Sequence, residues 1–216
     1  MSLLECLVGF ALCLILVGPL LKNSGELIAK QIELEKTQSL ALEADRALEL
    51  IGRSIRMAGY QNSPPLSAKR MEKSKYSFIQ IQKGVGFQNS DSIMVKHEVS
   101  RGVDFDCIGN VITQERSKQN LAQHGFMVDR QASIPKGMRV NGGSLICQSL
   151  DRQGRLQNTT LMNGINRLSI EPIQASTQTT ASSNGGAQTF RVKLEMTDGA
   201  KIQRIFERTF STRNLS

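Results

Sequence analysis

The sequence lacks the residue patterns that mark common catalytic and metal sites. It has no phosphate-cradling glycine motif, no Gly-x-Ser-x-Gly and no Cys-x-x-Cys. His97 and His124 are the only histidines, and neither has a second metal ligand at a suitable spacing; His97 lies in a strand pattern and is expected on the strand surface. Asp104 and Asp106 flank Phe105, but two carboxylates alone are weak support for a cation site. We therefore expect no enzyme activity, no cofactor and no metal.

Basic residues are in excess, but they form no block. The chain has 27 Lys and Arg against 19 Asp and Glu, a net charge of +8. Such a charge favours anionic surfaces, including nucleic acid and lipid headgroups. The basic residues are scattered over 46–75 and 191–213, with few aromatic side chains between them. Nucleic acid is therefore only a weakly supported partner.

The N-terminal segment Met1–Leu21 is an apolar run of about the length needed to cross a bilayer. It lacks the basic start and the small-x-small end of a cleaved secretory signal, so we expect a retained transmembrane anchor. Glu5 is its one ionisable residue, and a carboxylate at the centre of such a helix costs roughly 2.5–3.5 kcal/mol. Cys6 and Cys13 are expected to act as small apolar residues. Pro19, near the end of the run, should loosen the helix locally.

A long amphipathic helix is predicted to continue this run. Apolar residues recur at steps of three and four positions, which is the helical period. They are Leu40, Ala44, Ala47, Leu48, Ile51, Ile55 and Ala58. Gly59 suits the residue after the helix end, and Pro64 with Pro65 prevents continuation. A helix of this length would span roughly 85 Å, which a small domain cannot cover, so its first half needs other partners.

The remainder of the chain alternates apolar and polar residues and predicts antiparallel strands. The expected strands are 76–82, 91–99, 142–150 and an edge-like 168–173, followed by a hairpin of 190–196 and 202–210 around Asp198-Gly199. One face of this sheet should cover the apolar stripe of the helix. The polar segment 174–189 is expected to be a flexible loop.

Cys107 and Cys147 lie in this strand-rich part, 40 residues apart. A cysteine pair in a domain exported across a membrane indicates a disulfide. Closing a loop of that size contributes roughly 3–4 kcal/mol in the chain-entropy model.

In these features the chain resembles the type IV pilins and pseudopilins. The shared features are the apolar N-terminal helix with Glu5, a Gly-Pro near its end, and a long amphipathic continuation. Three segments narrow the resemblance to PilW-type minor pilins: Arg53-Ser-Ile-Arg-Met-Ala-Gly-Tyr60, the frame of Asp106-Cys-Ile-Gly109 with Leu-Ile-Cys147, and Thr209-Phe-Ser-Thr-Arg-Asn214. The J-type minor pseudopilins of type II secretion are the nearest alternative family.

The resemblance implies an α+β, pilin-like fold. It implies an N-terminal pilin helix over 1–58, with 1–21 transmembrane, and a β-rich periplasmic or extracellular domain over 59–216. It also implies that a prepilin peptidase removes a basic leader and that Met1 becomes the methylated first residue, where this family usually has phenylalanine. Glu5 would then pair with the N-terminal amine of a neighbouring subunit.

The function implied is that of a minor pilin. It would join other minor pilins and the major pilin, prime type IV pilus assembly through the assembly machinery, and sit at the pilus tip. The sequence does not distinguish a pilus for twitching motility from one for adhesion or DNA uptake. Before assembly it would be a single-pass inner-membrane protein with its C-terminal domain in the periplasm. Two alternatives stay open: a type II secretion minor pseudopilin, and a membrane-anchored DNA- or polyanion-binding module of a DNA-uptake pilus.

Overall fold

The computed structural model describes residues 3–61, 78–100, 102–118, 120–132, 134, 142–173 and 187–213. It has the α+β architecture predicted, with one long helix, α1 (Leu3–Met57), followed by a seven-stranded antiparallel sheet. The chain divides into two compact units, Met1–Ser39 and Leu40–Ser216, and α1 contributes residues to both. Most of the predicted flexible loop 174–189, from 174 to 186, lies outside the described residues.

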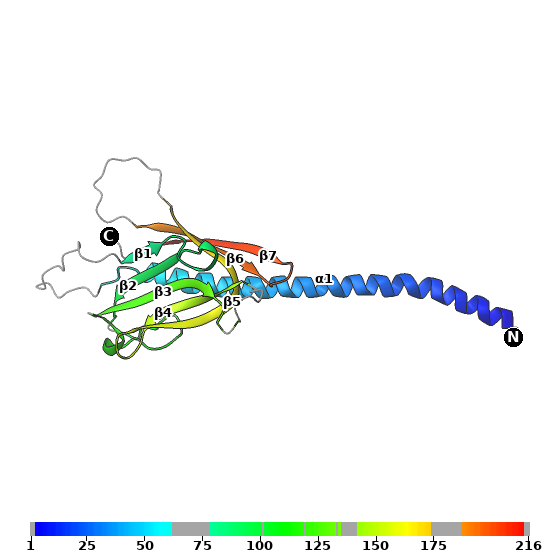
Figure 1. Cartoon of the computed structure of the whole chain (residues 1–216), viewed down its shortest axis with the longest axis horizontal. Helices are drawn as coiled ribbons and strands as arrows, with labels where there is room; N and C mark the ends of the chain where they lie inside the picture. Colours follow the sequence, from blue (N-terminus) through cyan, green and yellow to red (C-terminus); the bar gives the residue numbers. More distant parts are fainter. Residues whose placement is uncertain are drawn as a thin grey trace, which may run out of the picture. The chain divides into compact units, whose positions relative to one another are not determined.

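The sheet is a meander in which each strand pairs with the next one in the chain (Figure 1). Its strands are β1 (Ile79–Gln82), β2 (Ser92–Glu98), β3 (Leu121–Arg130), β4 (Gly143–Leu150), β5 (Leu156–Ile173), β6 (Thr189–Thr197) and β7 (Gln203–Ser211). Two single-turn 3-10 helices, η1 (Phe87–Asn89) and η2 (Gln114–Arg116), lie in the connections. Because neighbouring strands are consecutive, the sheet needs no crossover connections.

The C-terminal end of α1 lies where the sequence predicts it. The helix stops at Met57, and Gly59 adopts φ +70°, the left-handed conformation that glycine accepts at low cost. The Gly59 N–H then donates to the Lys96 carbonyl of β2, at 3.1 Å. This bond attaches the end of the helix to the sheet.

The second half of α1 packs its apolar stripe against one face of the sheet, as predicted. All seven predicted stripe residues belong to the main hydrophobic core, and none is more than 8% exposed. From the sheet, the core receives inward side chains of every strand from β2 to β7, including Phe126 at the centre of β3. Full burial of one large apolar side chain stabilises the folded state by about 1.5–3 kcal/mol. The contact between α1 and the sheet therefore holds the second unit together.

The strand β5 differs from its prediction. It runs for 18 residues through the interior of the sheet, whereas only an edge-like 168–173 was expected. Its pairing with β4 ends at Ile165, so the proline at 172 pairs with β6 alone and its missing N–H interrupts no ladder with β4. Beyond Ile165, the edge of β5 that no longer pairs with β4 is partly satisfied by Asp91, whose carboxylate accepts the Ile170 N–H at 2.8 Å.

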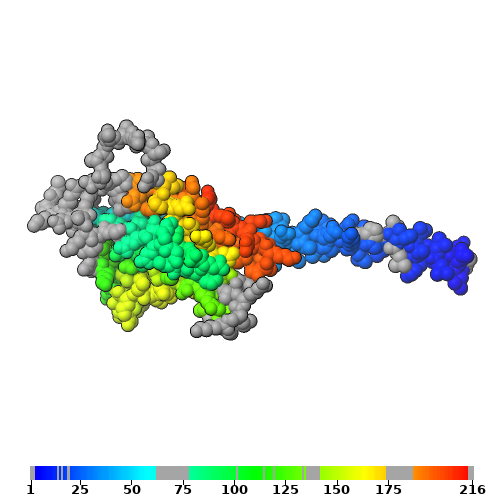
Figure 2. Space-filling model, turned by 45° about the horizontal axis from the view of Figure 1, so that its top comes forward, coloured from blue at the N-terminus to red at the C-terminus, as the bar shows by residue number. Residues whose placement is uncertain are grey.

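The C-terminal hairpin formed by β6 and β7 is confirmed. The Asp198 carboxylate accepts backbone N–H groups in the turn, and Gly199 has φ +77°. On the other side of the hairpin, the Phe210 ring lies directly over Gly52 of α1. Arg208 makes an ion pair with Asp45 of α1 at 2.6 Å. In Figure 2 the two strands, orange to red, form part of the surface of the second unit.

Candidate functional site

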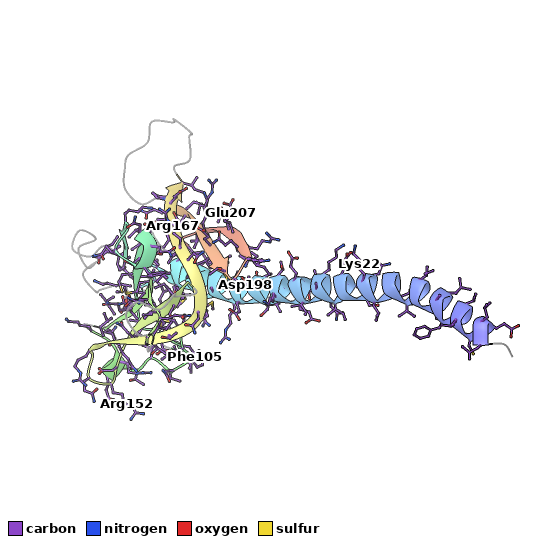
Figure 3. All side chains as sticks on the ribbon, turned by 45° about the vertical axis from the view of Figure 1, so that its right-hand side comes forward. Lys22, Phe105, Arg152, Arg167, Asp198 and Glu207 are labelled. Carbon is purple, nitrogen blue, oxygen red and sulfur yellow. A yellow bond between two sulfur atoms is a disulfide. The ribbon has the colours of Figure 1, made fainter. Side chains whose placement is uncertain are left out.

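The first unit of the chain presents a large apolar surface. Among its described side chains, the big aliphatic and aromatic ones from Leu3 to Leu34 have exposed fractions between 45% at Val17 and 82% at Leu3. In Figure 3 the side chains of this part of α1, Lys22 among them, project outward from the helix. Contiguous apolar surface on this scale marks a site that contacts another protein or a membrane.

Two of the predicted assembly residues can be located. Glu5 lies in the first turn of α1, where a carboxylate interacts favourably with the helix dipole. The helix continues through Pro19 without a break, although the side chain of Pro19 lies outside the described residues. Met1 also lies outside them. The pairing of Glu5 with a neighbouring subunit and the loosening at Pro19 stay predictions.

Among the described residues, no helix is both long enough and apolar enough to cross a membrane.

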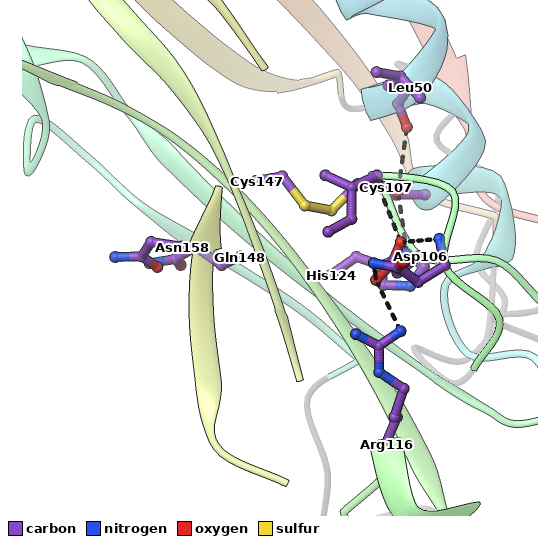
Figure 4. Close-up of a disulfide and its surroundings, with 11 residues drawn as sticks. Leu50, Asp106, Cys107, Arg116, His124, Cys147, Gln148 and Asn158 are labelled. Carbon is purple, nitrogen blue, oxygen red and sulfur yellow. Dashed lines mark hydrogen bonds and ion pairs between the residues drawn. A yellow bond between two sulfur atoms is a disulfide. The ribbon is translucent and has the colours of Figure 1, made fainter. Parts of the chain in front are cut away.

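The predicted disulfide is present in the second unit. Cys107, in the loop between β2 and β3, is bonded to Cys147 of β4 (Figure 4). Next to it, the Asp106 carboxylate accepts the N–H groups of Ile108 and Asn110 at 3.0 and 2.8 Å and lies 3.7 Å from the Arg116 guanidinium. Asp106 therefore organises this loop. We refer to residues 102–118 as the disulfide loop.

Behind the disulfide loop lie two buried histidines. His97 is fully buried, so its predicted position on the strand surface is wrong. It faces inward because it continues the alternation of Ile93 and Val95 on β2. Its ring meets that of His124 edge to face, with centroids 5.1 Å apart. The sequence places His97 in a strand pattern but assigns no element to His124, and it carries no signal that the two rings would meet.

The tautomer of His124 follows from its contact with α1. Its Nδ1 lies 3.5 Å from the Ser54 hydroxyl, which also lies 3.2 Å from the Leu50 carbonyl oxygen, a group that can only accept (Figure 4). We assign the Ser54 hydrogen to the shorter of these two contacts, and on this assignment Nδ1 of His124 carries the ring proton. The other ring nitrogen, Nε2, is left with a lone pair.

Burial controls the charge of both rings. Loss of solvent lowers the pKa of His124 from 6.5 to about 4, helped by the neighbouring His97 and by the Arg53 charge, while Asp106 and Asp104 oppose the shift. Burial also lowers the pKa of His97, and Asp104 partly offsets it. Both imidazoles are therefore neutral at pH 7.

The chemistry open to this cluster is limited. Among the described residues, no three His, Cys, Asp or Glu side chains are placed to hold a metal. The carboxylates of Asp104 and Asp106, considered above as cation ligands, instead accept backbone N–H groups, that of Ser100 at 2.7 Å in the case of Asp104. The histidine cluster connects β2 and β3 to α1 through the His97–His124 and His124–Ser54 contacts. The exposed apolar helix is the stronger candidate for function. Comparisons with protein-family models, curated proteins and solved structures found no match to the chain.

Proposed function

We propose that this chain is a minor pilin of the PilW type. It assembles with other minor pilins and the major pilin, primes type IV pilus assembly and sits at the pilus tip. The observation that carries the proposal is the exposed apolar surface of α1 within Met1–Ser39. The apolar stripe that the sheet buries runs from Leu40 to Ala58 and includes no described residue of the first unit. The apolar surface of the first unit therefore needs another binding partner.

Two environments would cover it in succession. Before assembly the N-terminal segment lies in the inner membrane, and in the fibre it packs against the same segments of neighbouring subunits. Each large side chain that moves from water to an apolar environment contributes about 1.5–3 kcal/mol. Many described apolar side chains between Leu3 and Leu34 are exposed. The summed free energy of burying them favours a segment that is always covered by lipid or by neighbouring subunits.

Glu5 gives the assembled state its specificity. It is the single acidic or basic side chain between Met1 and Leu21. In a core of packed apolar helices, a carboxylate requires an opposite charge to offset its desolvation. The N-terminal amine of the adjacent subunit, produced by a prepilin peptidase and methylated, is the partner we propose. This pairing would fix the axial register between neighbouring helices.

The second unit supports this role in a different way. Its sheet buries the stripe of α1 from Leu40 to Ala58 and is closed by the Cys107–Cys147 disulfide. A disulfide is typical of a domain that folds in an oxidising compartment such as the periplasm. The domain is therefore suited to a position outside the membrane and then on the fibre surface.

Substitution of Glu5 tests the proposal. Glu5→Ala should leave the protein in the membrane fraction but remove it from fibres sheared off the cells, because the charge partner is lost while the apolar surface is kept. Glu5→Gln, which keeps the shape and loses the charge, should behave in the same way.

Glu26→Ala is the matched control, since Glu26 is an exposed glutamate of the same helix beyond the apolar run. It should enter fibres as the parent protein does. Normal entry of both Glu5 variants into fibres would contradict the charge pairing. Absence of the parent protein from every fibre preparation would contradict the pilin assignment itself.

A further inference from the structure

Three buried polar atoms belong to residues that line one small pocket in the second unit. They are Nε of Arg116, Nε2 of His124 and Oγ of Ser149, and none has a hydrogen-bond partner within the part of the chain that the structure describes. All three residues line the same pocket. Their side chains come from η2, β3 and β4, so the pocket lies where the disulfide loop meets the sheet.

The burial of these atoms makes the arrangement unusual. Ser149 is 1% exposed and His124 is 6% exposed. A buried polar atom without a partner costs about as much as its lost hydration, so folded proteins supply a partner in nearly every case. Three such atoms at one pocket point to a shared partner.

The hydrogen-bond capacities of the three atoms restrict what that partner can be. With the ring proton of His124 assigned to Nδ1, its Nε2 has a lone pair. Nε–H of Arg116 can only donate, and the Ser149 hydroxyl can donate or accept. The partner must therefore donate one hydrogen bond and accept another.

We propose that this pocket binds one structural water molecule. Water donates to Nε2 of His124, accepts from Nε–H of Arg116 and shares its remaining capacity with Ser149. A halide anion has no hydrogen for the Nε2 lone pair, and a metal cation would be repelled by the Arg116 guanidinium. The pocket has room for about one water-sized sphere. Buried waters typically make about three hydrogen bonds, which is the number available here.

The water would act as a second attachment of the disulfide loop. The Cys107–Cys147 bond connects this loop to β4 by a covalent link. The water connects it to β3 and β4 through Arg116, whose guanidinium also pairs with Asp106 at 3.7 Å (Figure 4). The loop is thereby held at Cys107, before the η2 turn, and at Arg116, the last residue of that turn. This inference is independent of the assembly role proposed above.

A crystal structure of the full chain in detergent, at neutral pH and at a resolution that shows ordered waters, tests the proposal. We expect a single density peak within hydrogen-bonding distance of the Arg116, His124 and Ser149 atoms. After the crystals are soaked in bromide, this peak should give no anomalous signal. A pocket without density, or one with a bromide signal, would overturn the assignment of water.

A solution measurement avoids dependence on crystals. In the full chain in micelles, the Nε–H proton of Arg116 should show a nuclear Overhauser effect from a long-lived water. Ser149→Val, whose methyl groups would fill the pocket, should abolish this effect. The absence of the effect in the parent protein, or its persistence in a folded Ser149→Val protein, would contradict the proposal.

Discussion

Acid should weaken the second unit of the chain through His124. The folded protein holds the pKa of this imidazole at about 4, against 6.5 for an ordinary histidine, mainly because the ring is buried. Below 6.5 the unfolded chain therefore binds a proton that the folded chain excludes. Stability contributed by the neutral ring is complete above pH 6.5 and is lost as the pH falls toward 4.

The size of the effect follows from the two pKa values. A difference of one in pKa is worth about 1.4 kcal/mol, so the full penalty for values of 6.5 and about 4 is about 3 kcal/mol. Between about pH 7 and pH 5, the loss from His124 alone is about 2 kcal/mol. The lowered pKa of His97 adds a loss of the same sign.

Urea unfolding of the full chain in detergent, followed by circular dichroism at a series of pH values, measures this loss. The chain has no tryptophan, so circular dichroism is the better probe of its unfolding. The matched variant is His124→Gln, which keeps a side-chain donor for Ser54 but does not titrate. Carboxylates contribute equally to both proteins, so the difference in their pH dependence isolates the ring. An equal loss of stability between pH 7 and pH 5 in parent and variant would refute the reasoning.

Three further predictions concern the packing, the disulfide and the charge of the second unit. Gly52→Ala should lower the melting temperature, because the new Cβ would lie 2.2 Å from the Phe210 ring. Overpacking of this kind costs about 1–3 kcal/mol, against about 1 kcal/mol gained in helix propensity. An unchanged or higher melting temperature would show that the ring moves freely. Cys107→Ser with Cys147→Ser should reduce the free energy of unfolding by about 3–4 kcal/mol. Mass spectrometry of the non-reduced protein should find no free thiol at these two positions, and free thiols there would contradict the disulfide. Binding to DNA, followed by fluorescence anisotropy of a labelled duplex, should occur at low salt and vanish at moderate salt, since only the general excess of basic charge drives it; salt-resistant binding would favour a dedicated polyanion site.

The helix and its buried stripe were predictable because their signals are local. The spacing of residues from Leu40 to Ala58 identifies the buried face, and Gly59 identifies the end of the helix. The hairpin of β6 and β7 was equally accessible, since strict alternation surrounds the Asp198-Gly199 turn. In these segments each residue's own preference agrees with the final fold.

Strand β3 was not predicted, and its sequence explains why. It carries Gln123, His124 and Gly125 at its centre, which interrupt the apolar alternation even though His124 faces the core. His124 also explains why the buried pair of histidines was not predicted. A histidine is expected at least partly at the surface unless its partners are known. Those partners, Ser54 and His97, are remote in the sequence and meet only in the fold. The first half of β5 was missed for a related reason, since its polar residues are largely exposed.

The exposed apolar surface of the first unit and the proposed role of Glu5 lead to one decisive measurement. The protein should be extracted from membranes of cells that carry its native partners, captured through a C-terminal tag, and its co-purifying proteins identified by mass spectrometry. Our account predicts other minor pilins together with the major pilin, and their loss from the Glu5→Ala sample but not from the Glu26→Ala sample. Recovery of secretion pseudopilins alone, or of no pilin-like protein, would contradict it.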